Sequence, residues 1–72
     1  KIYMLKEYNT QRIACVSEDI KLIRKTSDRK YFDPEYKDYP LLSIYENGVK
    51  IKSIEGCEVL NHIAREINNL NK

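Results

Sequence analysis

Glycine, proline and cysteine are scarce in this chain, and tryptophan is absent. The 72 residues include two of each of the three scarce types and a single histidine. Two glycines leave no Gly-rich loop of the kind that cradles phosphate, and one histidine with two distant cysteines cannot complete a zinc site. Cys15 and Cys57 match no metal-binding spacing, so we expect free thiols. The sequence therefore predicts neither a bound metal nor a cofactor.

Long apolar runs and an excess of one charge are also missing. No segment approaches the roughly 18 apolar residues of a membrane span, and no secretory signal pattern opens the sequence. Thirteen basic and eleven acidic residues give a net charge of +2, which is too balanced to predict nonspecific nucleic-acid binding. We expect a cytoplasmic protein with no membrane contact.

Motifs that carry catalysis are absent as well. The acidic residues are scattered along the chain, and no nucleophile elbow is present, so we expect a protein that is not an enzyme. Residues with AT-rich codons (Lys, Asn, Ile, Tyr, Phe and Met) number 32, against 10 with GC-rich codons (Gly, Ala, Arg and Pro). This bias indicates an AT-rich genome, such as that of a low-GC bacterium or one of its phages.

The residues that are present predict regular secondary structure from the start of the chain. Residues 2–8 (IYMLKEY) and 12–16 (RIACV) are rich in apolar and β-branched residues, which predicts two strands joined by a turn at NTQ. Ser17 is a favourable N-cap for a helix that runs to about Thr26. The first part of the chain is therefore a predicted hairpin followed by a helix.

The strongest local signal is Asn47-Gly48 within LLSIYENGVKIKSI, because a two-residue type I′ turn needs positive φ at both positions. Such a turn pairs Tyr45 with Lys50 and Ile44 with Ile51, and this register predicts one core face and one exposed face. The predicted core face carries Leu42, Ile44, Val49 and Ile51. The predicted exposed face carries Ser43, Tyr45, Lys50 and Lys52.

A second helix follows Gly56, with apolar residues at helical spacing to about position 70. His62 is predicted on its exposed flank, between Glu58 and Glu66 at spacings of four. The chain is thus hairpin, helix, hairpin, helix in one domain of residues 1–72. A sheet with both helices on one face buries both amphipathic stripes at once. We predict an α+β fold, a small two-layer ββαββα domain with a mainly antiparallel four-stranded sheet.

The stretch from residue 40 to residue 67 resembles the C-terminal half of thioredoxin-like proteins. That half consists of a cis-proline, a strand, an Asn-Gly hairpin, a second strand, a glycine and a closing helix. The matching residues here are Pro40, Asn47, Gly48, Gly56, Ile63 and Ile67. The resemblance implies a cis Tyr39–Pro40 bond. Where the family carries Cys-x-x-Cys, this chain has NTQRIAC with Cys15 alone, so the resemblance implies a degenerate member without dithiol chemistry.

Residues 29–40 (RKYFDPEYKDYP) combine tyrosines, charged side chains and two prolines. The prolines exclude a regular helix or central strand, and so long a connection in a small domain is typical of a functional loop. Tyrosine and arginine are enriched at binding hot spots, so we interpret the segment as a recognition surface. The alternative is a lid in which the aromatic rings fold back over the core. The candidate binding residues are Arg29, Lys30, Tyr31, Tyr36, Lys37 and Tyr39.

Three functions stay open at this point. The first is a phage or bacterial inhibitor or sequestering protein, whose Tyr-rich segment binds a host protein or a host signalling ligand. The second is a binder of nucleotides or single-stranded nucleic acid, with Tyr45, Lys50 and Lys52 as a stacking and charge-pairing surface beside the segment. The third is the degenerate thioredoxin-like protein, and with it redox activity through Cys57, whose thiolate the positive end of the second helix would favour.

The predicted sheet face without helices bears on oligomeric state. It is expected to carry Leu41, Ser43, Tyr45 and Ile54 beside Lys50 and Lys52. A small domain rarely leaves such a face uncovered, and a two-fold contact reuses one patch on both subunits. We therefore expect a homodimer, with the alternative of a monomer whose Tyr-rich segment covers the face.

Overall fold

The computed structural model describes residues 1–27 and 38–71. Its strands are β1 (Ile2–Glu7), β2 (Ile13–Ser17), β3 (Pro40–Glu46) and β4 (Val49–Glu55), and its helices are α1 (Ile20–Ser27) and α2 (Glu58–Leu70). The element order is ββαββα, which confirms the predicted order.

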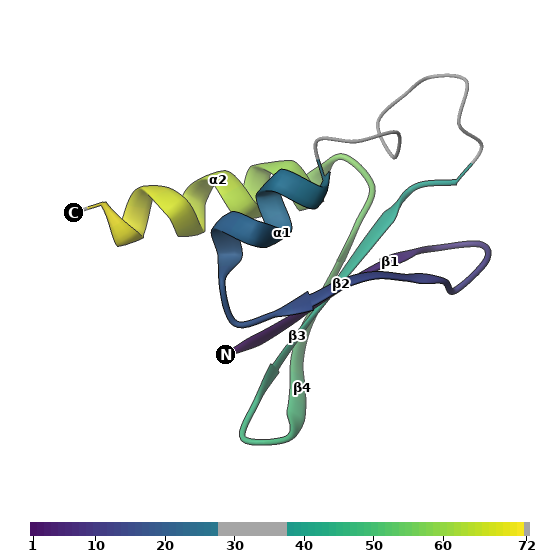
Figure 1. The fold of residues 1–72 in the computed structure, drawn as a ribbon, viewed down its shortest axis with the longest axis horizontal. Coiled ribbons are helices and arrows are strands. Elements are labelled where there is room, and N and C mark those ends of the chain that lie inside the picture. The colour runs from purple at the N-terminus through teal and green to yellow at the C-terminus, as the bar shows by residue number, and fades with distance from the viewer. Residues whose placement is uncertain (28–37, 72) are drawn as a thin grey trace.

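The four strands form one antiparallel sheet in the order β2-β1-β3-β4 (Figure 1). β1 and β3 lie in the centre, and β2 and β4 form the two edges. α1 connects β2 to β3, so the β1–β3 pair is what joins the first hairpin to the second.

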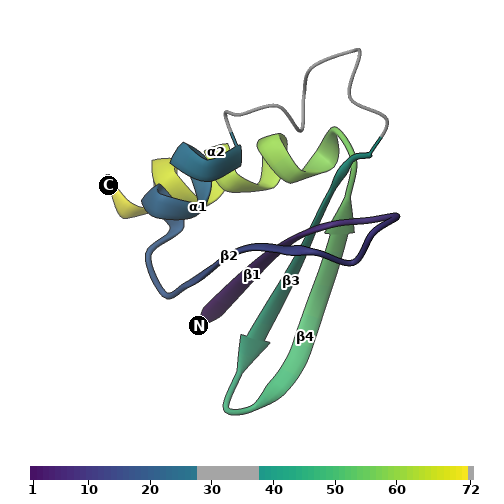
Figure 2. The same cartoon turned by 45° about the vertical axis from the view of Figure 1, so that its right-hand side comes forward.

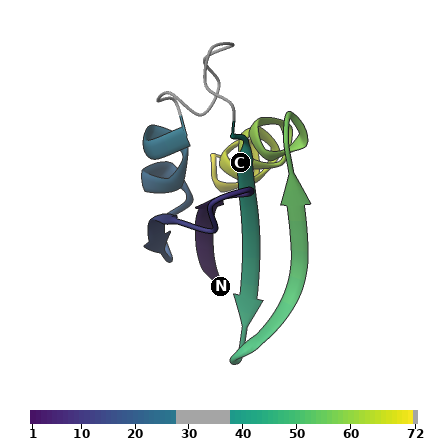
Figure 3. The same ribbon diagram turned by 90° about the vertical axis from the view of Figure 1, so that its right-hand side faces the viewer.

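Both helices lie against the same face of the sheet, which confirms the predicted two-layer α+β architecture (Figures 1 and 3). α1 contacts β1 and β2, α2 contacts β3 and β4, and the two helices contact each other. Every second residue of β1 and β3 enters the core, as strand geometry requires. The buried apolar residues are Tyr3, Leu5, Ile20, Ile23, Leu42, Ile44, Val59 and Ile63.

The first helix begins later than its predicted N-cap at Ser17. Ser17 is the last residue of β2, where it pairs with Tyr3. Its Oγ accepts a hydrogen bond of 2.9 Å from the Asp19 backbone N–H, and the Asp19 carboxylate accepts one of 2.9 Å from the Lys21 N–H. Asp19 therefore caps α1, because sheet pairing has taken Ser17 into the strand.

The β3–β4 turn forms at the predicted residues. Asn47 and Gly48 have φ values of +54° and +80°, and Glu46 pairs with Val49 across the turn. Positive φ at both central positions is the requirement of a type I′ turn. The turn prediction is confirmed.

The register of this hairpin changes two residues beyond the turn. Tyr45 pairs with Lys50 as predicted, but Ile44 pairs with Lys52. Ile51 is therefore an extra residue in β4, a β-bulge that the predicted pairing of Ile44 with Ile51 did not include. All β4 residues from Lys52 onward consequently face the opposite side from the predicted one.

The bulge changes which residues of the hairpin reach the core. Leu42 and Ile44 are buried as predicted, but Val49 and Ile51 are 63% and 50% exposed. The end of the hairpin extends beyond the part of the sheet that the helices cover, as Figure 2 shows. Ile54 packs against the core instead. The prediction that Val49 and Ile51 are core residues is wrong.

Pro40 begins β3 at a position where its missing N–H is not needed for the ladder. Its carbonyl accepts a hydrogen bond of 3.0 Å from the Gly56 N–H. The described peptide bonds include no cis bond, so the Tyr39–Pro40 bond is trans. The cis bond implied by the thioredoxin-like resemblance is not present.

Candidate binding surfaces

Most of the predicted Tyr-rich surface lies outside the described residues. The residues concerned are Arg29, Lys30, Tyr31, Tyr36 and Lys37. Tyr39 is described, and its ring stacks on Tyr8 with 4.5 Å between ring centroids and 17° between planes. The Tyr8 N–H donates a hydrogen bond of 2.9 Å to the Tyr39 carbonyl. The end of the Tyr-rich segment is thus attached to the end of β1 by a partly exposed pair of tyrosines.

Asp38 fixes the same corner of the molecule. Its Oδ1 accepts hydrogen bonds from the Asn9 N–H (2.7 Å) and the Tyr39 N–H (2.9 Å), and its Oδ2 accepts one from the Thr10 N–H (3.1 Å). Burial raises the pKa of Asp38, but the backbone donors favour the carboxylate more strongly, and the net result is a lowered pKa. Burial and the neighbouring Tyr8 raise the pKa of Tyr39. Asp38 has a structural role in holding the first turn.

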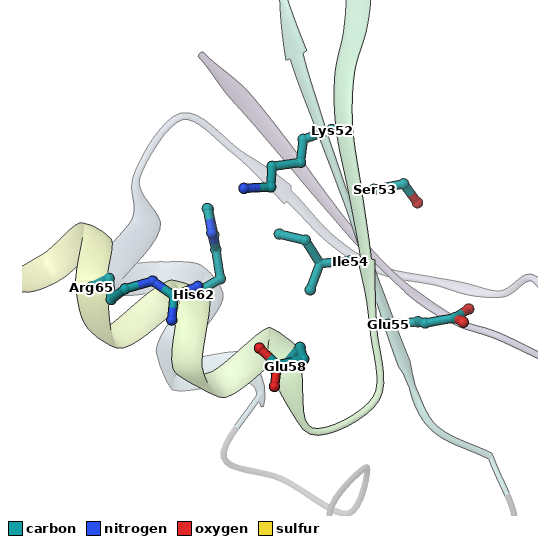
Figure 4. Close-up of a pocket in the computed structure, with 7 residues that line it drawn as sticks. All are labelled: Lys52, Ser53, Ile54, Glu55, Glu58, His62 and Arg65. Carbon is teal, nitrogen blue, oxygen red and sulfur yellow. The ribbon is translucent and has the colours of Figure 1, made fainter.

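The predicted surface of Tyr45, Lys50 and Lys52 is divided between the two faces of the sheet. Tyr45 and Lys50 pair directly on the face without helices. Lys52 pairs with the core residue Ile44, and its side chain is directed toward α2 in Figure 4. The extra residue Ile51 causes this division. The prediction that the three side chains share one exposed surface is wrong.

The sheet face without helices, the open face, is apolar over β2, β1 and β3. Its residues follow from the cross-strand pairs, which alternate with the core pairs. The apolar residues are Ile2, Met4, Ile13, Val16, Leu41 and Tyr45. The polar residues are Lys6, Ser43, Lys50, Ser53 and Glu55. Ile54, which was predicted here, lies on the other side with Lys52, because the bulge shifts both by one position.

A pocket of about 340 Å³ lies between β4 and α2 and is called the β4–α2 groove (Figure 4). It is lined by Lys52, Ser53, Ile54, Glu55, Glu58, His62 and Arg65. In Figure 4 the side chains of Lys52 and Ile54 point toward α2, whereas those of Ser53 and Glu55 point away from it. The groove therefore has the edge strand as one wall and the helix as the other.

Lys52 and Arg65 are the two cations that line this groove. Lys52 on β4 and Arg65 on α2 form no ion pair with another described residue. Burial lowers the pKa of the adjacent His62; Glu66 raises it, Lys52 and Arg65 lower it further, and the net result is a lowered pKa. His62 is therefore uncharged at neutral pH, and the two cations supply the positive charge.

His62 is 9% exposed, and not on an exposed flank as predicted, because this side of α2 packs toward β4. Its Nε2 lies 3.2 Å from Glu66 Oε1, although without hydrogen-bond geometry. Glu66 Oε2 accepts a hydrogen bond of 3.2 Å from the Tyr3 hydroxyl. Burial, followed by the charge of Glu66, raises the pKa of Tyr3 to about 12. Through its contact with the Tyr3 hydroxyl, Glu66 thus links α2 to β1.

The described residues offer few groups for chemistry. Cys15 is half-buried, Cys57 is exposed, and both are free thiols as predicted. Within residues 1–27 and 38–71, no three His, Cys, Asp or Glu side chains come together as metal ligands. None of the described helices has the length and apolar character needed to cross a bilayer.

The chain matches no protein-family model, and no match was found among curated proteins or among solved structures.

The β4–α2 groove was missed by the sequence reasoning, although one signal for it is present. Val49 and Ile51 fit one strand phase, whereas Ile54 fits the opposite phase. A change of phase within one strand indicates a bulge, and a bulge at Ile51 turns Lys52 toward the helices.

Proposed function

We propose that this protein is a non-enzymatic binding protein, an inhibitor or sequestering protein, that assembles through the open face of its sheet. One observation carries the proposal. Ile2, Ile13 and Val16 are 44%, 56% and 51% exposed on that face, and both helices lie on the other side of the sheet. An exposed apolar face of this kind is typical of a protein contact.

A second copy of the chain fits this face. A two-fold axis across the strands lays β4 of one subunit over β4 of the other in the opposite direction. Lys50 and Glu55, at opposite ends of β4 on the open face, then face their oppositely charged counterparts. The strand spacing and rise give a face of roughly 20 Å by 20 Å. Because this lies at the small end of protein interfaces, we expect a weak, reversible dimer.

The proposed dimer leaves the helix side of each subunit accessible. The β4–α2 groove opens on that side, so two grooves per dimer stay free for a partner. Two identical sites on one assembly increase retention of a partner that is itself multivalent. This arrangement suits sequestration.

Sedimentation equilibrium over a range of micromolar concentrations tests the assembly. The wild-type mass should rise above the 8.6 kDa of one chain as concentration increases. Val16→Lys places a charge in the apolar face and should remain monomeric. Leu22→Lys is the matched control, because Leu22 is 45% exposed on α1 and lies outside the open face. A wild-type mass of 8.6 kDa at every concentration contradicts the proposal.

A further inference from the structure

The edge of β4 next to the groove has free backbone hydrogen-bonding groups. The Gly56 N–H donates to the Pro40 carbonyl at 3.0 Å. Hydrogen-bonded pairs alternate along an antiparallel ladder, so Ile54 and Lys52 direct their backbone groups toward β3. Ser53 and Glu55 therefore direct their N–H and C=O groups outward, where no described strand lies.

This stretch of β4 is a better template for an added strand than the opposite edge. Ser53 and Glu55 lie beyond the bulge at Ile51, where the pairing with β3 is regular. β2 has only five residues, and its own bulge at Ala14 interrupts the pairing with β1. An exposed, regular edge is what an extended peptide needs for strand addition.

The groove has room for one side chain of such an added strand. Alternate side chains of an added strand point toward the helix side, where the wall is formed by Ile54, Lys52 and Arg65. In Figure 4 Lys52 and Arg65 lie on either side of His62 and Glu58 lies at the start of α2, while Glu55 points to the opposite face. The two cations outnumber Glu58 among the charged side chains that are directed into the groove, so its net charge is positive and complements a carboxylate.

We propose that the β4–α2 groove binds an extended, acidic segment of a partner protein, which adds to β4 as a fifth strand and places a carboxylate near Lys52 and Arg65. The Ser53 and Glu55 backbone pairs with the segment, and Ile54 contacts a side chain two positions from the carboxylate, which points to the same side. The inference rests on the proposed function as a binding protein and names the chemistry of its partner, but it does not depend on the dimer.

A peptide titration tests both halves of this site. The probe is acetyl-Thr-Val-Asp-Val-Thr-amide, added at up to millimolar concentration to the ¹⁵N-labelled full chain and followed by amide chemical shifts. The largest shifts are expected at the outward amides of Ser53 and Glu55, with smaller shifts at Tyr45 and Lys50 on the open face. The same peptide with Asn for Asp should bind more weakly, because it lacks the carboxylate.

Variants of the protein and of the probe distinguish the contribution of Lys52 and Arg65 from that of backbone strand pairing. Lys52→Gln and Arg65→Gln should each weaken binding of the Asp peptide roughly fivefold and leave the Asn peptide nearly unchanged. Lys21→Gln is the matched control, because Lys21 is an exposed cation on α1 and does not line the groove. A probe N-methylated at its backbone amides should lose binding to the unaltered protein, which tests strand pairing without a risk to folding.

The outcomes distinguish this inference from the proposed function. Absence of shifts at millimolar peptide, or shifts confined to Ile2, Met4, Ile13 and Val16 on the apolar part of the open face, overturns the groove proposal. ATP or inorganic phosphate that shifts Lys52 and Arg65 amides, while the peptide does not, identifies a small-anion site and also overturns it. The Val16→Lys monomer should bind the probe as the wild type does, so loss of the dimer and loss of peptide binding are read independently.

Discussion

The two β-hairpins of this protein turn by different means. The β3–β4 turn depends on its own two residues, Asn47 and Gly48, which both have positive φ. The β1–β2 turn depends on a residue far along the chain, because Asp38 accepts the backbone N–H groups of Asn9 and Thr10. Within the first turn, only Gln11 has positive φ, at 61°.

Buried polar groups accompany the first turn and not the second. Glu7 is 1% exposed; its Oε1 accepts a hydrogen bond of 3.0 Å from the Thr10 hydroxyl and lies 3.6 Å from Arg12 Nε. Around the second turn, Glu46 and Val49 are exposed. A turn encoded by its own residues can extend into solvent, whereas a turn held by distant side chains must stay packed against the domain that supplies them.

The largest effect is expected from a substitution of Leu5, the buried residue of β1 that pairs with both β2 and β3. Leu5 in β1 is fully buried and pairs with Leu42 of the second hairpin and Cys15 of the first. Leu5→Ala should lower the free energy of unfolding by about 3 kcal/mol, out of roughly 4–11 kcal/mol for a chain of this size. Urea unfolding followed by circular dichroism measures it. Val49→Ala, at a side chain that is 63% exposed, should cost less than about 0.5 kcal/mol. A loss below about 1 kcal/mol for Leu5→Ala contradicts its role in joining the hairpins.

A smaller effect tests the locally encoded turn. Gly48 has φ of +80° with open space around its Cα, so Gly48→Ala introduces backbone strain and no clash. We expect a loss of about 1–2 kcal/mol in the free energy of unfolding, by urea titration. In the other hairpin, Gln11→Gly relieves strain at a φ of 61° and should change the free energy of unfolding by no more than about 0.5 kcal/mol. Equal losses from both changes would show that the two turns are not encoded differently.

The smallest effect tests the turn held at a distance, and it depends on pH. The pKa of Asp38 is lowered in the folded protein, so its stabilising contribution is complete above the ordinary value near 3.8 and is lost as pH falls toward the folded pKa. Asp38→Asn keeps one acceptor oxygen and should lower the Tm by a few degrees at neutral pH. Its Tm should also fall less steeply than that of the wild type between about pH 4 and pH 2. Gly48→Ala should lower the Tm equally at every pH, and parallel profiles for Asp38→Asn and the wild type would contradict the role of the carboxylate.

Local chemistry made much of the fold predictable. The Asn47-Gly48 turn, the amphipathic spacing of the helices and the apolar strands were sufficient for the ββαββα order and for both helices on one face. The errors arose where a distant partner decides. Ser17 became a strand residue because Tyr3 pairs with it, and the anchoring of the first turn by Asp38 has no local signature.

The candidate site was less predictable, because one bulge decides it. The sequence predicted Lys52 beside Tyr45 on an exposed surface, because alternate residues of a regular hairpin share one face. Ile51 interrupts the alternation, and Lys52 then lies with Arg65 in a groove that no short motif describes. The Tyr-rich segment remains a predicted recognition surface, and Tyr39 is its candidate residue that the structure describes.

The bulge in β4 has a consequence for how the gene can change. Loss of the codon for Ile51 leaves Tyr45 paired with Lys50 and Ile44 paired with Lys52, so the ladder becomes regular and the groove keeps both of its walls. Loss of the codon for Ser53 instead shifts Lys52 relative to Ile54 by one position and turns one of them to the opposite face. Two single-codon deletions, two codons apart, thus differ in whether the β4–α2 groove is preserved.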